Sequence, residues 1–289
     1  MPLLETARIG FSTASLAGCS LSDALRIGAQ MGFETCELLA FDAYRHSQGV
    51  LGGFYFEHMS AAEKDRLLEQ CAPYTRITTH APFIDIASLA PNPSIREAAQ
   101  RQLGIAIEAV AFLGGHNTTT HISPKHIYPL AEYKGEIVEL YRRLGDLAGE
   151  REVMVSVETG YPAGVEAFAD VVWSIDHPAV GVTVDVGHLV SAIPTELRGT
   201  AEGVTLYGDL LEAHLRSLEG KIVLFHMHDI RPSDFRDHRA VGRGFLDYAR
   251  ILATASDIGY EGDFVFELEE PDTETALPES RDVLAAVEW

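Results

Sequence analysis

The stretch Val180-Gly181-Val182-Thr183-Val184-Asp185-Val186-Gly187-His188 sets a pattern that recurs along the chain. Its first five residues form a short, uncharged run rich in valine, typical of a strand covered on both faces in a parallel sheet. A carboxylate and then a histidine follow where the run ends. We therefore expect a buried strand whose carboxyl end presents chemically reactive side chains.

Runs of the same kind recur throughout the 289 residues and predict eight strands. These strands are expected at residues 8–13, 35–39, 76–80, 118–121, 153–158, 180–185, 222–226 and 263–267. The stretches between them carry apolar residues at helical spacing. Helices are expected at residues 21–31, 61–70, 95–113, 135–147, 165–175, 206–218 and 246–258. The order Ser60-Ala61-Ala62-Glu63 has the form of a capping box and predicts a helix start at Ala61.

Eight strands alternating with helices predict an α/β protein with a (β/α)8 TIM barrel, formed as a single domain by residues 1–289. A doubly wound open sheet is the competing fold. It requires a glycine-rich turn after the first strand, and Phe11-Ser12-Thr13-Ala14-Ser15 lacks one. In a barrel, the loops that follow the strands build the active face.

The composition narrows the classes of partner. The formal net charge of −21 opposes tight binding to the phosphates of a nucleic acid. Three widely spaced cysteines do not indicate a disulfide framework. No stretch has the roughly 18 apolar residues of a membrane span, and the N-terminal residues lack the regions of a signal peptide. A cytoplasmic protein without a membrane partner is expected.

Six successive predicted strands end in a histidine or a carboxylate. These residues are His80, His121, Glu158, Asp185, His226 and Glu267. Carboxylates that converge on one barrel mouth repel each other unless a cation lies between them, and mixed Glu, Asp and His ligands suit Mn²⁺, Co²⁺, Mg²⁺ or Zn²⁺. His226 and His228 are two residues apart and face the same side of their strand, so either of them could bind the ion.

The other histidines have no such position. Six of them fall in helices or peripheral loops and are expected to be exposed or locally hydrogen-bonded. They are His46, His58, His116, His126, His177 and His214.

From the third predicted strand to the eighth, a series of motifs resembles the xylose isomerase-like TIM-barrel superfamily, which includes the AP endonuclease family. The motifs are Thr79-His80-Ala81-Pro82-Phe83, Val155-Ser156-Val157-Glu158-Thr159, Val184-Asp185-Val186-Gly187-His188, Phe225-His226-Met227-His228-Asp229, His238-Arg239-Ala240-Val241-Gly242-Arg243-Gly244 and Phe264-Val265-Phe266-Glu267. Each motif alone is loose, but their joint order is fairly specific.

The resemblance implies one divalent metal ion and no organic cofactor. Its ligands would be Glu158, Asp185, His226 and Glu267, with His226 preferred because the family ligand usually stands three residues before an acid, here Asp229. His228 stays open as the alternative. Substrate contacts are expected from His80, His121, His188, His228, His238 and Arg243. Homodimers and homotetramers are common in the family, and either is expected here.

The implied activity is that of an isomerase or epimerase acting on a sugar, keto-sugar or cyclitol. It would proceed through a metal-bound enediolate, with Glu158 and Glu267 as bases. A lyase or dehydratase acting on a related keto-sugar is one alternative. The other is a zinc-dependent, AP endonuclease-like phosphodiesterase. That branch has an aspartate two residues before the loop histidine His238, where this chain has Arg236.

Overall fold

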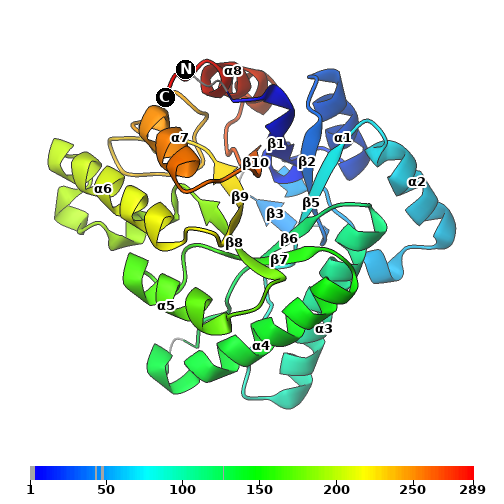
Figure 1. The fold of residues 1–289 in the computed structure, drawn as a ribbon. Coiled ribbons are helices and arrows are strands. Elements are labelled where there is room, and N and C mark those ends of the chain that lie inside the picture. The colour runs from blue at the N-terminus through cyan, green and yellow to red at the C-terminus, as the bar shows by residue number, and fades with distance from the viewer. Residues whose placement is uncertain (1–3, 43, 47–48, 126) are drawn as a thin grey trace.

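A closed barrel of parallel strands forms the centre of the protein, described by a computed structural model over residues 4–42, 44–46, 49–125 and 127–289 (Figure 1). Around the barrel, the strands run in the order β1-β10-β9-β8-β7-β6-β5-β2. Their bounds are β1 Ile9–Ser12, β2 Thr35–Leu39, β5 Arg76–His80, β6 Asn117–Thr120, β7 Met154–Glu158, β8 Val180–Asp185, β9 Ile222–Met227 and β10 Asp263–Phe266. Each lies within one residue of its predicted range, so the predicted TIM barrel is confirmed.

A ring of helices covers the barrel (Figure 1). These are α1 Leu21–Gln30, α2 Ala61–Cys71, α3 Pro93–Phe112, α4 Leu130–Glu150, α5 Val165–Ile175, α6 Ala201–Ser217, α7 Tyr248–Asp257 and α8 Thr273–Ala285. The first seven confirm the predicted helices, and α2 begins at the predicted capping box of Ser60 and Glu63. Helix α8 was not predicted. Its interior Pro278 lacks an N–H donor and ordinarily signals a helix break.

The long connection after β2 contains a small antiparallel hairpin, which the sequence did not reveal. Strands β3 Tyr44–His46 and β4 Gly49–Leu51 form it. Leu51 packs with Leu39 and Phe41 in an apolar cluster separate from the main core. Because Leu39 is the last residue of β2, this cluster holds the hairpin beside the barrel mouth.

Inside the barrel, every second residue of a strand points to the axis. Glu37 on β2 reaches Thr119 on β6, with 3.3 Å between Oε2 and Oγ1, and Thr119 reaches Thr183 on β8 at 3.0 Å. Thr183 in turn lies 2.6 Å from the hydroxyl of Ser156. These side chains come from strands that are not all neighbours, so their bonds cross the interior. The inner layer below the mouth is therefore a buried hydrogen-bonded network.

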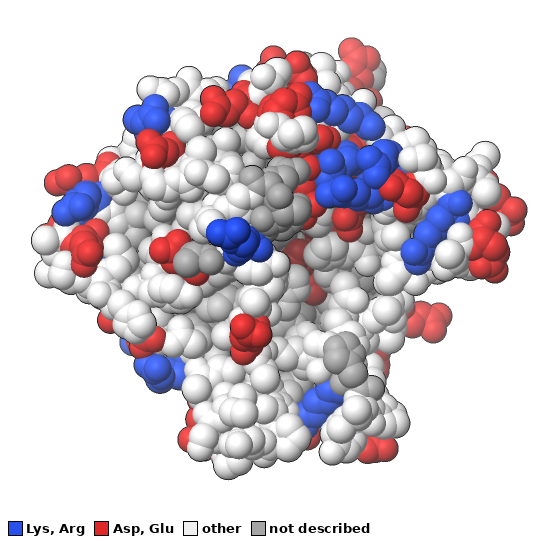
Figure 2. All heavy atoms as spheres, turned by 180° about the vertical axis from the view of Figure 1, so that it is seen from behind, with Lys and Arg blue, Asp and Glu red and all other residues white. Residues whose placement is uncertain are grey.

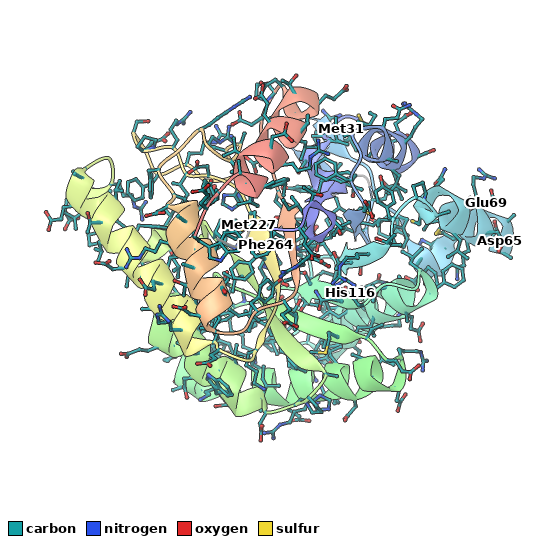
Figure 3. The ribbon with its side chains drawn as sticks, turned by 45° about the horizontal axis from the view of Figure 1, so that its top comes forward. Met31, Asp65, Glu69, His116, Met227 and Phe264 are labelled. Carbon is teal, nitrogen blue, oxygen red and sulfur yellow. The ribbon has the colours of Figure 1, made fainter. Side chains whose placement is uncertain are left out.

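The alternate residues face the helices. Met227 and Phe264, on the paired strands β9 and β10, are fully buried inside the helical ring, whereas Asp65 and Glu69 project from α2 into solvent (Figure 3). Among the described residues, no helix combines the length and the hydropathy that crossing a membrane requires. Residues 1–3 and His126, which entered the expectations above, lie outside the described part of the chain, as does the side chain of His46.

A matched pair of glycine substitutions tests the packing of α1 on β1. A Cβ on Gly28 would lie 2.1 Å from the buried ring of Phe11, whereas one on Gly135 in α4 would meet nothing within 4 Å. We expect Gly135→Ala to raise the free energy of unfolding by up to about 1 kcal/mol. Gly28→Ala should lower it by about 1–3 kcal/mol through overpacking. Denaturant titration measures both, and equal stabilisation by the two would contradict this packing.

Candidate active site

The predicted strand-end residues come together at the carboxyl ends of the barrel strands. Glu158 and Asp185 end β7 and β8, and His226 lies opposite Asp185 in the register of β8 and β9. His80 ends β5, and His121 and Glu267 follow β6 and β10 directly. In a parallel barrel these ends form one face, so six separate segments contribute to one buried cluster.

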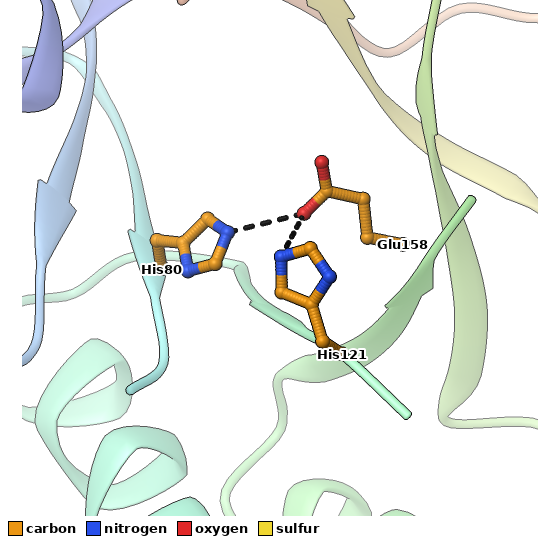
Figure 4. A group of neighbouring side chains, drawn as sticks. All are labelled: His80, His121 and Glu158. Carbon is orange, nitrogen blue, oxygen red and sulfur yellow. Dashed lines mark hydrogen bonds and ion pairs between the residues drawn. The ribbon is translucent and has the colours of Figure 1, made fainter. Parts of the chain in front are cut away.

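Glu158 lies at the centre of this cluster. Its Oε2 is 3.1 Å from His80 Nε2 and 2.8 Å from His121 Nε2 (Figure 4). Its Oε1 is 3.2 Å from His226 Nδ1 and 3.5 Å from His188 Nδ1. The carboxylate is almost fully buried, so these four imidazoles take the place of water around its charge.

His226 joins this cluster to Glu37, a residue that the sequence analysis missed. Nδ1 of His226 faces Glu158 and lies 3.4 Å from Glu267 Oε2, whereas Nε2 lies 3.2 Å from Glu37 Oε2. A carboxylate behind the second nitrogen fixes the ring orientation of a metal-binding histidine. Glu37 lies inside β2 rather than at its end. Its signal was a carboxylate within an otherwise uncharged, mostly apolar strand.

Asp185 and His228 form a second arrangement beside the first. Nε2 of His228 is 2.9 Å from Asp185 Oδ1, and Nδ1 accepts a hydrogen bond of 3.1 Å from the backbone N–H of His238. A neutral imidazole that accepts at Nδ1 carries its proton on Nε2. His228 therefore donates to Asp185, which favours His226 over His228 as a metal ligand. Gly187 N–H also donates to Asp185 Oδ1, at 2.7 Å, and the ring of His238 stacks on His228.

Two opposing effects set the pKa values in the cluster. Burial disfavours the ionised form of each group, and neighbouring groups of opposite charge favour it. Burial acts to raise the pKa of Glu158, but His121 and His226 hold it well below its ordinary value. Burial likewise opposes ionisation of Glu267, yet His226 and His238 lower its pKa to about 2. Conversely, burial disfavours the charged form of His80, but Glu158 raises its pKa to about 9. The pKa of His226 is raised well above normal against its burial by Glu267, Glu37 and Glu158.

Among the residues that the structure describes, three sets of side chains have ligand atoms within 4.8 Å of one another. They are His80, His121 and Glu158; Asp185, His228 and His238; and Glu158, Asp185, His226 and Glu267. Donor atoms around a tetrahedral zinc ion lie roughly 3.3–3.6 Å apart, so the four-residue set would draw together around a bound ion. That set supplies three carboxylates and one imidazole, ligands that suit hard to borderline divalent cations.

A cavity of about 290 Å³ opens above the cluster. Of the six predicted substrate-contacting residues, His80, His121, His188 and His238 line it. His228 is fully buried behind Asp185. Arg243 lies apart from the cavity lining, and its guanidinium binds Asp272 in a bidentate pair at 2.9 Å and Glu279 at 3.0 Å.

The loop that carries His238 is held by one buried carboxylate, that of Asp229. It accepts backbone N–H bonds from Gly242 at 3.1 Å, Gly244 at 2.8 Å and Leu246 at 3.1 Å. A Cβ on Gly244 would overlap the Asp229 carboxylate at 2.1 Å. Gly244 thus lets the backbone close around Asp229, which fixes the loop beside the cavity.

Of the four peripheral histidines whose side chains the structure describes, three follow the expectation. His58 is exposed, and His116 and His177 are partly exposed beside Asp263 and Asp146. The expectation for His214 was wrong. It is buried in α6 against the ring of Phe168, and its nitrogens bond to no residue that the structure describes. Burial lowers its pKa to about 4, so the neutral ring packs as an apolar group.

Replacing His228 tests its assignment as a donor to Asp185. We expect His228→Ala to weaken the affinity for Mn²⁺ or Zn²⁺ by about 10- to 100-fold, as is typical when a group that orients a ligand is lost. His228→Gln, which retains an N–H donor, should lose less, and His226→Ala should lose most. Titration calorimetry gives the three affinities. Equal losses in His226→Ala and His228→Ala would contradict the assignment.

The affinity for a divalent ion should also rise with pH. The raised pKa of His226 keeps both ring nitrogens protonated at neutral pH. An ion must displace one of these two protons to be bound. The lowered pKa values of Glu158 and Glu267 keep both carboxylates ionised near neutral pH, so these two ligands release no protons when the ion binds. Titrations in buffers of different ionisation enthalpy count the released protons. A pH-independent affinity without proton release would contradict this electrostatic description.

Similarity to known proteins supports the fold. The structure resembles a D-tagatose 3-epimerase-like protein, with 20% identity, a TM-score of 0.72, and coverage of 96% of this chain and 98% of the other. It also resembles D-psicose 3-epimerase from Clostridium cellulolyticum H10, solved with D-tagatose, with 16% identity, a TM-score of 0.73, and coverage of 96% and 97%. The zinc-bound IOLI protein is similar at 18% identity, a TM-score of 0.71 and 96% coverage of both chains.

A curated relative is an uncharacterized protein, MJ1311, of Methanocaldococcus jannaschii. It is 26% identical over 198 residues, which cover 64% of this chain and only 62% of that relative's length. Residues 25–287 match the model of the xylose isomerase-like TIM barrel family. Because that match covers far more than half of the 289 residues, the chain belongs to the xylose isomerase-like TIM barrel family.

Proposed function

We propose that this protein is a divalent-metal-dependent isomerase or epimerase acting on a sugar, keto-sugar or cyclitol. The observation that carries the proposal is the convergence of Glu158, Asp185, His226 and Glu267 beneath a cavity of about 290 Å³. That volume is at the lower end of ligand pockets, which suits a small substrate. The folds of D-psicose 3-epimerase and L-ribulose 3-epimerase, both similar to this one, lend further support.

In this proposal the four residues hold one ion, of Mn²⁺, Co²⁺, Mg²⁺ or Zn²⁺. One of the similar structures contains zinc and another magnesium. When bound, the ion supplies a Lewis acid that polarises the substrate's carbonyl and neighbouring hydroxyl oxygens. Glu37 and His228 act through His226 and Asp185, because their hydrogen bonds fix the orientation of those two ligands.

Glu158 and Glu267 would act as the two bases. Both line the cavity, and they approach it from two sides, because β8 and β9 lie between β7 and β10 in the barrel. One carboxylate removes the proton from the carbon that bears the hydroxyl and lies next to the carbonyl, which leaves an enediolate. Return of the proton to the neighbouring carbon isomerises the sugar. Return to the same carbon from the opposite face epimerises it.

The partly exposed histidines of the rim would orient the substrate. His121, His188 and His238 line the cavity, and each retains some solvent exposure. Burial lowers the pKa of His188, but Asp185 and Glu158 outweigh this effect and raise it. A protonated ring at this position donates hydrogen bonds to hydroxyl oxygens.

A phosphodiesterase of the AP endonuclease type is the second candidate. The observation that favours it is the presence of two further candidate ligand sets, one around His121 and one around His238. Two features oppose it. The chain carries a net charge of −21, which repels DNA phosphates. In addition, His228 donates its Nε2 proton to Asp185, so this nitrogen does not ligate an ion in the set around His238. Nicking of abasic duplex DNA by zinc-loaded protein would favour this candidate.

Solvent exchange tests the proposed chemistry. Wild-type protein loaded with Mn²⁺ should wash deuterium from D₂O into a ketose, keto-sugar or cyclitol at the carbon next to the carbonyl. Glu158→Gln and Glu267→Gln should each lower the rate by at least about 100-fold, since the amide cannot accept the proton. Glu69→Gln, on the exposed surface of α2, is the matched control. Near-wild-type exchange rates in both site variants would contradict the proposal.

A further inference from the structure

A second, larger cavity adjoins the one above the cluster. We call it the side groove and define its apolar lining by Phe83, Ile86, Ile127, Tyr128, Tyr161 and Val190. Its volume is about 970 Å³, compared with about 290 Å³ for the cavity above the cluster. Phe83, His121 and His188 line both, so the two spaces meet at these side chains. A ligand seated above Glu158 therefore has a continuous path into the side groove.

The size of the side groove exceeds what a lone monosaccharide needs. Ligand cavities span about 300–1,000 Å³, and the upper end of this range holds drug-sized molecules. The smaller cavity already suits one sugar ring. The groove is thus available to a further part of the same substrate, attached to the ring and extending past His121.

The lining of the groove is hydrophobic and only partly covered. Ile127 has 84% of its surface exposed, Tyr128 44% and Phe83 38%, although each is a large apolar side chain. Figure 2 shows this face of the molecule hollowed near its centre, with mostly uncharged side chains below the hollow. Clustered apolar side chains in a concavity are typical of a ligand site, because a hydrophobic group placed there removes their surface from water.

The charges around the side groove disfavour an anion. Asp85 and Asp237 are part of its lining. The one lysine or arginine among its described lining residues, Lys125, is neutralised by Glu136, whose two carboxylate oxygens lie 2.8 and 2.7 Å from Nζ. The ring of His188 is likewise paired, 3.5 Å from the carboxylate of Glu158 and 3.7 Å from that of Asp185. A phosphate in the groove would meet two carboxylates, and the cationic groups there are already paired with other carboxylates. An uncharged group would meet no such cost.

We propose that the substrate is a sugar that carries an uncharged hydrophobic substituent, such as an aromatic ring, and that the side groove holds this substituent while the sugar lies above Glu158. The inference rests on the proposed function and narrows its substrate class to sugar conjugates. Phe83 lies at the junction of the two cavities, with its ring 5.2 Å from that of His80 and 5.3 Å from that of His121. It would contact the link between sugar and substituent.

Binding to the metal-loaded protein tests this inference independently of turnover. Titration calorimetry would compare D-fructose with its 1-O-benzyl, 6-O-benzyl, 6-O-glucosyl and 6-phosphate derivatives. One of the benzyl ethers should bind at least about 10-fold more tightly than the parent sugar, because burial of the ring in an apolar cavity adds affinity. The phosphate should bind no more tightly than the parent. Failure of both benzyl ethers to gain affinity, or tighter binding of the glucosyl or phosphate derivative, would overturn the proposal.

Matched double variants locate the gain in affinity. Ile127→Ala combined with Tyr128→Ala should reduce the ratio of benzyl to parent affinity at least about fivefold. Ile95→Ala combined with Tyr55→Ala removes the same atoms from exposed positions outside both cavities and should leave the ratio unchanged. An unchanged ratio in the groove variant would overturn the proposal. Tight, groove-dependent binding without deuterium exchange on any sugar would instead reject the isomerase function and retain the hydrophobic site.

Discussion

The buried carboxylate of Glu158 imposes the constraint on which the rest of the site depends. A charge removed from water needs compensation by opposite charge and hydrogen bonds. Four imidazoles, from the ends of β5, β6, β8 and β9, supply it within 3.5 Å. The strands that form the barrel also position these groups, so the fold and the site have the same origin. A divalent cation would replace the imidazole protons in this role.

The surroundings of this cluster hold it rigidly from below and from the side. Below it, the hydroxyls of Thr119, Thr183 and Ser156 link opposite walls of the barrel to Glu37. To the side, Asp229 gathers the loop after β9 around its carboxylate. Both networks are buried and hydrogen-bonded, which favours a single arrangement of the site. The open side groove is the contrasting region, and its exposed apolar surface is where substrate preference would be set.

The sequence predicted the architecture well because its signals were local. Strands with continuous apolar runs were located within one residue. Their parallel order places all the carboxyl ends on one face of the barrel, and the alternation of side chains turns the terminal ones inward. Helix α8 was missed because Pro278 normally ends a helix. Glu37 was missed because only tertiary structure shows that β2 lies beside His226. His214 was misjudged, since a helical histidine can be buried when packing supplies an apolar site. Arg243 was placed correctly in a loop, but nearby acids engage its charge.

The central claim is that Glu158, Asp185, His226 and Glu267 hold one divalent ion at the floor of the cavity. Crystals grown with Mn²⁺ and measured for anomalous scattering test it most directly. The claim predicts one strong anomalous peak per chain among these four side chains, with His226 Nδ1 and not His228 as the nitrogen ligand. A peak ligated by His228, peaks confined to His80 and His121 or to His238, or no peak at all would contradict it.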